Sequence, residues 1–120
     1  MADLLRAADL PEDFAYPGEF VRTVELGLTS LEPWWILQGD LLQRRLAGLR
    51  DRFPNRVLVP FAVRQDNDDV ACFVPGARSV AVIHDFAKPG WEDVAILDDF
   101  HSWFRKAVED FIEFGEMEFG

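Results

Sequence analysis

The chain has 120 residues, of which 49% are hydrophobic, and a formal net charge of −10 at pH 7. That length suits one domain, residues 1–120, because a chain of this size buries roughly two thirds of its unfolded surface. The negative charge disfavours direct binding to nucleic acid or anionic lipid, and every apolar run falls short of the roughly 18 residues that span a bilayer.

The N-terminal part predicts a short helical start, a turn at residues 10–13 and then a helix. Pro17 lies near the first turn of this helix, where proline is favoured, and apolar residues follow at helical spacing. Gly27 is expected to end the helix, because glycine often follows the last helical residue.

Residues 31–37 (LEPWWIL) have the aromatic content of a β-strand, and Pro33 places them at a sheet edge or makes the start of the strand irregular. A second helix is expected from Asp40, as its N-cap, to Phe53, with leucines recurring at helical spacing. Pro54 then breaks the helix before the central strands.

The central strands are predicted from two apolar runs, LVPFAV and VACFV, that flank the polar tip 64–69. Short β-branched and aromatic runs separated by Asp and Asn are typical of a β-hairpin. A further strand, residues 79–85, follows the turn PGAR and extends the hairpin to an antiparallel meander. Both faces of the strand after the tip are apolar, so helices are expected to cover the sheet on both sides.

The last predicted element is a long amphipathic helix. It is expected to begin at Asp98 or Asp99 as its cap and to bury an apolar stripe that includes Trp103 and extends to Ile112. These elements together predict an α+β fold with a mostly antiparallel sheet of about four strands, packed by helices.

The location of the protein is predicted from its single cysteine and its first residues. Cys72 has no partner thiol in the chain, and MADLLRAADL lacks the basic and apolar regions of a signal peptide. We therefore expect a cytoplasmic protein with no membrane span.

The hairpin tip concentrates three carboxylates, those of Asp66, Asp68 and Asp69, within four residues. Their mutual repulsion must be relieved by water, by a cation or by basic groups of the protein or a partner. The spacing fails the EF-hand pattern, because Val70 and Ala77 stand where the fifth and twelfth ligand positions would be. A looser divalent-cation site at the three aspartates stays an alternative.

No specific enzyme motif is present, and we predict no catalytic residues, no metal and no cofactor. His84 and Asp85 with Cys72 on the neighbouring strand resemble a nucleophile and its base. Adjacent strand residues point to opposite faces, however, so Asp85 is poorly placed to orient the His84 ring.

The charge is concentrated in the second half: residues 1–64 hold 9 acids and 8 bases, and residues 65–120 hold 13 acids and 4 bases. Such a field attracts basic proteins. Trp91 lies in the loop KPGWED and is the tryptophan we expect at the surface, where this residue type often anchors a partner. The candidate partner-binding residues are Asp66, Asp68, Asp69, Trp91, Glu92, Asp93, Glu109, Asp110 and Glu113.

Five segments occur in an order that resembles the SUKH superfamily, which includes many bacterial toxin-immunity proteins and the yeast cell-wall assembly regulator. They are LPEDFAYPGEFVRTVELGL, EPWWIL, LVPFAVRQDNDDVACF, IHDFAKPGWED and WFRKAVEDFIEF, of which RQDNDDVACF is the most specific. The resemblance covers nearly the whole chain. It implies an α+β fold, no catalytic residues and, for many bacterial members, binding to a cognate toxin that is often a nuclease.

Our leading hypothesis is a non-catalytic immunity protein that docks its acidic half on a basic partner, such as a polymorphic toxin domain. Two alternatives stand beside it: a regulatory scaffold that binds a partner unrelated to toxins, and a divalent-cation-dependent enzyme. In the leading hypothesis the tip aspartates either hold the hairpin together or contact the toxin directly.

Overall fold

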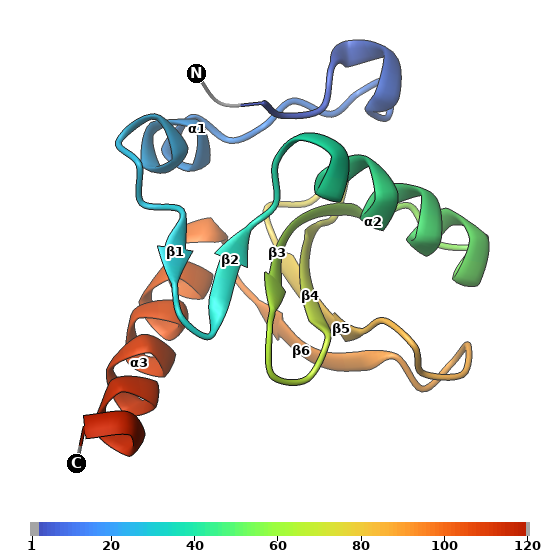
Figure 1. The fold of residues 1–120 in the computed structure, drawn as a ribbon. Coiled ribbons are helices and arrows are strands. Elements are labelled where there is room, and N and C mark those ends of the chain that lie inside the picture. The colour runs from blue at the N-terminus through green and yellow to red at the C-terminus, as the bar shows by residue number, and fades with distance from the viewer. Residues whose placement is uncertain (1–2, 120) are drawn as a thin grey trace.

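A computed structural model describes the backbone of residues 3–119 and the side chains of residues 3–117. Within these residues, one six-stranded antiparallel sheet packs with three α-helices in an α+β fold (Figure 1). The strands lie in the sheet in their order along the chain, which is a meander. The elements are η1 (Ala7–Asp9), α1 (Gly18–Glu25), β1 (Ser30–Leu31), β2 (Trp34–Ile36), α2 (Gly39–Arg52), β3 (Val59–Arg64), β4 (Asp69–Phe73), β5 (Val80–His84), β6 (Asp93–Leu97) and α3 (Phe100–Phe119).

The helix ends follow the sequence signals in two of three cases. Gly27 lies just beyond α1 with a φ of +77°, a left-handed conformation that glycine adopts easily, as expected for a helix stop. The Asp99 carboxylate accepts a hydrogen bond from the backbone N–H of Ser102 (2.8 Å) and so caps α3. The prediction for α2 was wrong by two residues, because its N-cap is Gln38 and Asp40 lies in the first turn.

The sheet has six strands where the sequence predicted about four. The strand expected at residues 31–37 is in fact a small hairpin, with Pro33 in the turn between β1 and β2. Proline suits that turn because it has no N–H to donate to a strand partner. Strand β6 was not predicted, since its sequence DVAIL is too short for its apolar pattern to distinguish strand from helix.

Both faces of the central strands are covered, as the sequence predicted. On one face, α1 and α3 pack over an aromatic core, and on the other, the end of α2 covers a smaller core. Phe61 and Phe73 stack in the first, with ring centroids 4.3 Å apart. The second contains Leu49, Phe53, Leu58, Val70, Cys72, Ala81 and Ile83.

Helix α3 buries only the first part of its apolar stripe. Phe100, Trp103 and Ala107 are buried, and the prediction for Trp103 is confirmed. Phe111 and Ile112, which were expected to pack on the sheet, are 46% and 51% exposed. The reason is geometric, because the last turns of α3 extend past β1 and β2 (Figure 1).

We expect Phe61→Ala to lower the free energy of unfolding by about 4 kcal/mol, since it removes the ring at the centre of the aromatic core. Urea denaturation monitored by circular dichroism measures the loss. The control Trp91→Ala deletes a side chain that is 82% exposed and should change stability by less than about 0.5 kcal/mol. A loss below about 1 kcal/mol for Phe61→Ala would contradict the packing described here.

Candidate functional site

Three connections between strands lie at one end of the sheet, which we call the acidic end. They are residues 32–33, the hairpin tip 65–68 and the loop 85–92. In an antiparallel meander every second connection falls at the same end, and these are the first, third and fifth. The acids of the tip and of the loop are therefore gathered at this end.

Helix α3 brings a second group of acids to the acidic end. It starts at the opposite end of the sheet, and its 20 residues span about 30 Å. By Asp110 it has reached Trp34 and Arg64, which pair with each other in β2 and β3. All nine candidate partner-binding residues consequently lie in segments at the acidic end.

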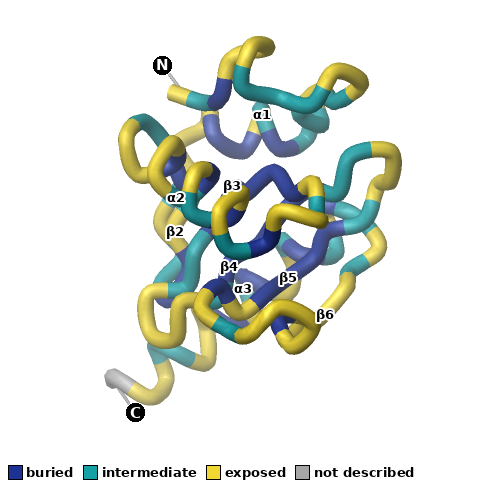
Figure 2. The backbone as a smooth tube through the Cα atoms, turned by 90° about the vertical axis from the view of Figure 1, so that its right-hand side faces the viewer, coloured by how far each residue is buried: buried dark blue, intermediate teal, exposed yellow. Residues whose placement is uncertain are grey.

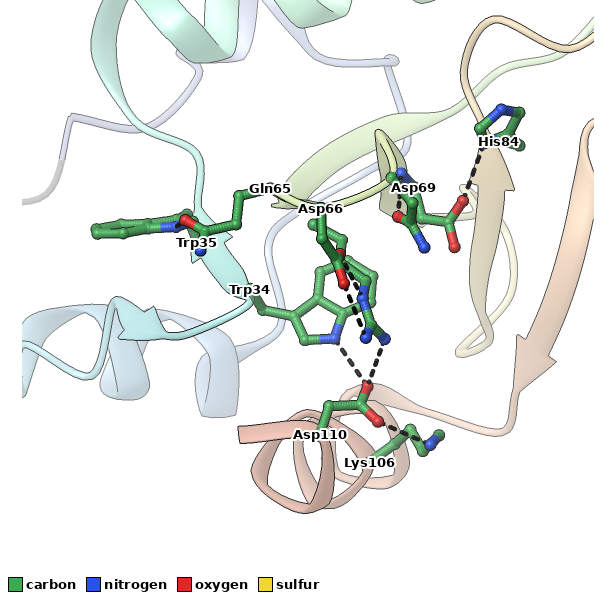
Figure 3. A network of polar contacts seen from close by, with 10 residues as sticks. Trp34, Trp35, Gln65, Asp66, Asp69, His84, Lys106 and Asp110 are labelled. Carbon is green, nitrogen blue, oxygen red and sulfur yellow. Dashed lines mark hydrogen bonds and ion pairs between the residues drawn. The ribbon is translucent and has the colours of Figure 1, made fainter. Parts of the chain in front are cut away.

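The Asp110 carboxylate is the centre of a polar network that joins three elements (Figure 3). It accepts hydrogen bonds from Trp34 Nε1 at 2.9 Å and from Lys106 Nζ at 2.8 Å, and Arg64 lies at 3.4 Å. Asp110 is only 5% exposed. A carboxylate in such a place is stable only with several donors, so the network fixes α3 against the sheet.

Arg64 extends this network to the hairpin tip. Its guanidinium contacts both oxygens of Asp66, at 2.7 and 3.3 Å, while also facing Asp110. The same base therefore relieves the repulsion at the tip and holds the tip near α3. Nearby, Trp35 donates an indole hydrogen bond to Gln65 (Figure 3).

The remainder of the tip is ordered by local hydrogen bonds. Asn67 Oδ1 accepts a hydrogen bond from the backbone N–H of Asp69 (3.0 Å), and Asp68 has a φ of +60°, which aspartate tolerates better than most residues. The Asp69 carboxylate lies 3.1 Å from His84 Nδ1. Asp68 is exposed and has no hydrogen-bond or ion-pair partner among the described side chains.

The tip aspartates do not converge on a common point. Asp66 turns to Arg64 and Asp69 turns to His84, each toward a basic group of the protein itself. Within the described residues, no group of three or more His, Cys, Asp or Glu side chains is arranged to hold a metal ion. The divalent-cation alternative therefore gains no support from this geometry.

Asp85 is fully buried, although it follows the exposed His84. Its two oxygens receive Arg52 at 2.6 and 2.8 Å and Arg45 at 2.6 Å, so it fastens the C-terminal half of α2 to the end of β5. The two neighbours, His84 and Asp85, thus have separate partners, as the strand alternation predicted.

Burial raises the pKa of the Cys72 thiol, which keeps it protonated and unreactive at neutral pH.

The loop 85–92 is tied to the segment between α2 and β3 through a second buried acid, Glu92. Arg56 donates to Glu92 at 2.9 Å and to Asp93 at 2.7 Å. The N–H of Gly90 donates to the other Glu92 oxygen at 2.6 Å, and Gly90 has a φ of +96° that favours glycine. The hydrogen bond from Arg56 is the main reason that the pKa of Glu92 lies below its ordinary value.

The candidate residues accordingly divide into paired and unpaired groups. Glu92 and Asp110 were expected on an exposed acidic surface, and this expectation was wrong, because each is only 5% exposed and is held by basic side chains. The residues paired but partly accessible are Asp66, Asp69 and Asp93. Those exposed without a hydrogen-bond or ion-pair partner among the described side chains are Asp68, Trp91, Glu109 and Glu113.

Sequence reasoning missed the bases that organise this end. Arg64 and Arg56 each hold two carboxylates, but their partners in α3, in the β5–β6 loop and at the start of β6 are 36 to 46 residues away in the chain. No local spacing reveals such pairs. The available signal was weak, namely an arginine at the boundary of a strand next to an excess of acids.

A cleft of about 480 Å³ opens at the opposite end of the sheet. Phe14, Phe73 and Phe100 line it together with the acids Asp13, Glu19 and Asp99 and the base Arg78. Among the described residues that line it there is no hydroxyl, thiol, imidazole or lysine amine. A covalent mechanism at this cleft would have only carboxylates as nucleophiles.

Fold and site together define an α+β domain with an antiparallel meander and one acidic end. Comparison with known protein families, with curated proteins and with solved structures finds no match to the chain. Among the helices of residues 3–119, none has the length and apolar content required to cross a bilayer.

We expect Asp110→Ala to lower the free energy of unfolding by about 3 kcal/mol, because it leaves the buried Trp34 N–H without its acceptor and removes the carboxylate that faces Arg64 and Lys106. Chemical denaturation measures this change. The neighbouring control Glu109→Ala removes an exposed acid and should cost less than about 0.5 kcal/mol. Equal losses for the two variants would contradict the structural role of Asp110.

The lowered pKa of Glu92 predicts a pH-dependent contribution to stability. The folded state holds the ionised form more strongly than the unfolded state, so the contribution is present above the ordinary glutamate pKa and is lost as pH falls through the folded value. The difference in unfolding free energy between wild type and Glu92→Gln should therefore be largest above about pH 5 and shrink toward about pH 3.

Denaturation curves between these pH values test this prediction. The control Glu25→Gln changes an exposed glutamate of α1, and its free energy of unfolding should stay within about 0.5 kcal/mol of wild type. A difference for Glu92→Gln that stays constant over the range would contradict the lowered pKa of Glu92 in the folded state.

Proposed function

We propose that the protein is a non-catalytic protein-binding domain of the toxin-immunity type, which neutralises a cognate toxin by docking its acidic end on a basic surface of that toxin. The observation that carries the proposal is the set of exposed acids Asp68, Glu109 and Glu113. They lie at one end of the sheet, on segments that the Arg64–Asp110 contact holds together. None of the three has an ion-pair partner among the described side chains.

The chemistry of such a partner follows from the charge. A basic surface on a toxin is typical of a nuclease, because it must bind phosphates. Covering that surface with fixed carboxylates excludes the nucleic acid, and charge complementarity increases the rate of association. The acids are held on rigid elements, a hairpin and a helix, so binding costs little conformational entropy.

The resemblance to the SUKH superfamily supports the same class of function, and SUKH membership is part of the proposal. The segment RQDNDDVACF carries the resemblance most specifically. In the structure this segment forms the hairpin tip and strand β4, and Arg64 and Asn67 make local contacts at the tip. These contacts favour a structural role for Asp66 and Asp69 and leave Asp68 as the tip residue available to a partner. A cytoplasmic location also belongs to the proposal, consistent with the single buried thiol of Cys72.

The proposal predicts salt-sensitive binding that depends on the three exposed acids. The triple variant Asp68→Lys, Glu109→Lys, Glu113→Lys should retain a basic protein from source-cell lysate at least tenfold less well than wild type. The control is Glu12→Lys, Asp13→Lys, Glu25→Lys, which makes the same change of charge on exposed acids outside the acidic end. This control variant should bind the basic protein like wild type, and high salt should release the basic protein from the control and from wild type.

The captured protein is then expressed alone and together with the wild type in a host cell. Growth arrest that only the wild type and the control relieve is the expected result. If the captured protein does not harm cells, the immunity function is wrong and a scaffold function replaces it. If both triple variants lose binding equally, net charge and not the acidic end is responsible.

A further inference from the structure

Strand β6 is an open edge of the sheet. Among residues 3–119 its only strand partner is β5, and residues 93–96 are all exposed, with Leu97 half-buried. Figure 2 shows β6 as an exposed segment beside the buried β5. An edge strand presents unpaired backbone N–H and C=O groups, which can bind one more strand.

Large apolar side chains gather around this edge. Val94 and Ile96 are 53% and 70% exposed on β6, and Phe86 and Trp91 are 61% and 82% exposed in the loop that leads to it. The Arg52 guanidinium lies 4.5 Å from the centre of the Phe86 ring, a cation–π contact that supports that side chain. Clustered apolar groups beside an open edge are typical of a protein-binding surface.

The charges at the ends of β6 indicate which kind of strand can bind to its open edge. In a symmetric antiparallel pair of two copies around Ala95, Asp93 of one copy would face Leu97 of the other. Asp98, the next residue, would then lie beside Asp93 at both ends of the pair. Arg56 pairs with Asp93 but leaves its side chain 61% exposed. Like charges so placed destabilise strand pairing, and each copy carries a net charge of −10. A second copy is therefore a poor partner.

A strand of opposite charge meets no such repulsion. We propose that the outer edge of β6 binds an extended segment of another protein, apolar in its middle and with Lys or Arg at both ends, as a seventh strand. The basic ends would lie near the exposed Asp98 and near Asp93, whose side chain stays 61% exposed although it pairs with Arg56. The apolar middle would lie beside Val94 and Ile96. This inference goes beyond the proposed function, because it requires neither a toxin nor the acids of the tip and α3.

A synthetic peptide tests the site on the whole protein. The probe is Lys-Val-Thr-Val-Thr-Val-Lys with blocked ends, and the comparison peptide has proline in place of the central valine, with the same charge. Hydrogen exchange followed by NMR reports which amides become protected. We expect protection in Asp93–Leu97 with the first peptide and at least tenfold weaker binding of the proline peptide, which cannot complete the strand.

Two variants separate strand addition from general attraction. Ile96→Lys places a cation on the edge and should weaken peptide binding at least tenfold. Leu41→Lys makes the same change at another exposed aliphatic residue, on α2, and should bind like wild type. Both side chains are exposed, so thermal unfolding should show both variants folded.

Three results would overturn the inference. One is no binding of the probe at all, and another is equal binding of the two peptides, which would show attraction by charge alone. The third is a concentration-dependent dimer of wild type, seen by sedimentation and abolished by Ile96→Lys, because it would place a second copy on the edge. Failure of the toxin experiment leaves the peptide result unaffected, so the two proposals are tested separately.

Discussion

One buried carboxylate, that of Asp110, determines how α3 lies across the sheet. It receives donors from β2, β3 and α3 itself, through Trp34, Arg64 and Lys106. A charge removed from water is tolerated only where such donors are fixed, so the network specifies one position of the helix. Because Arg64 also holds Asp66, the same interaction sets the relation between the helix and the hairpin tip, and hence the relative position of the exposed acids.

Two further buried acids apply the same principle on the other side of the sheet. Asp85 and Glu92 receive arginines from the last turns of α2 and the residues that follow, and they fasten that region to the β5–β6 hairpin. The carboxylates behind the net charge of −10 therefore form two populations. One population fixes the fold from within and is unavailable to a partner. The other is at least partly exposed, and this population can attract a basic surface.

The sequence predicted what depends on local pattern. The hairpin, the amphipathic C-terminal helix, the two covered faces of the sheet and the exposure of Trp91 all follow from spacing within about ten residues. The burial of Asp110 does not, because its partner Arg64 is 46 residues away. Strand β6 was missed for a related reason, since its four apolar residues form a strand only because β5 offers them an edge. Phe111 and Ile112 fit the helical stripe, but the sheet ends before it reaches them.

The two proposed surfaces differ in what they contribute to binding. Exposed acids act over a Debye length of roughly 8 Å, so they draw in a basic protein and orient it without fixing atomic contacts. An open strand edge acts only at contact, through directional backbone hydrogen bonds and flanking apolar side chains. Strand β6 begins at the acidic end with Asp93 and runs away from it. A basic segment bound along β6 would therefore start beside the exposed acids of the acidic end. One partner could first be attracted by these acids and then bind the strand edge.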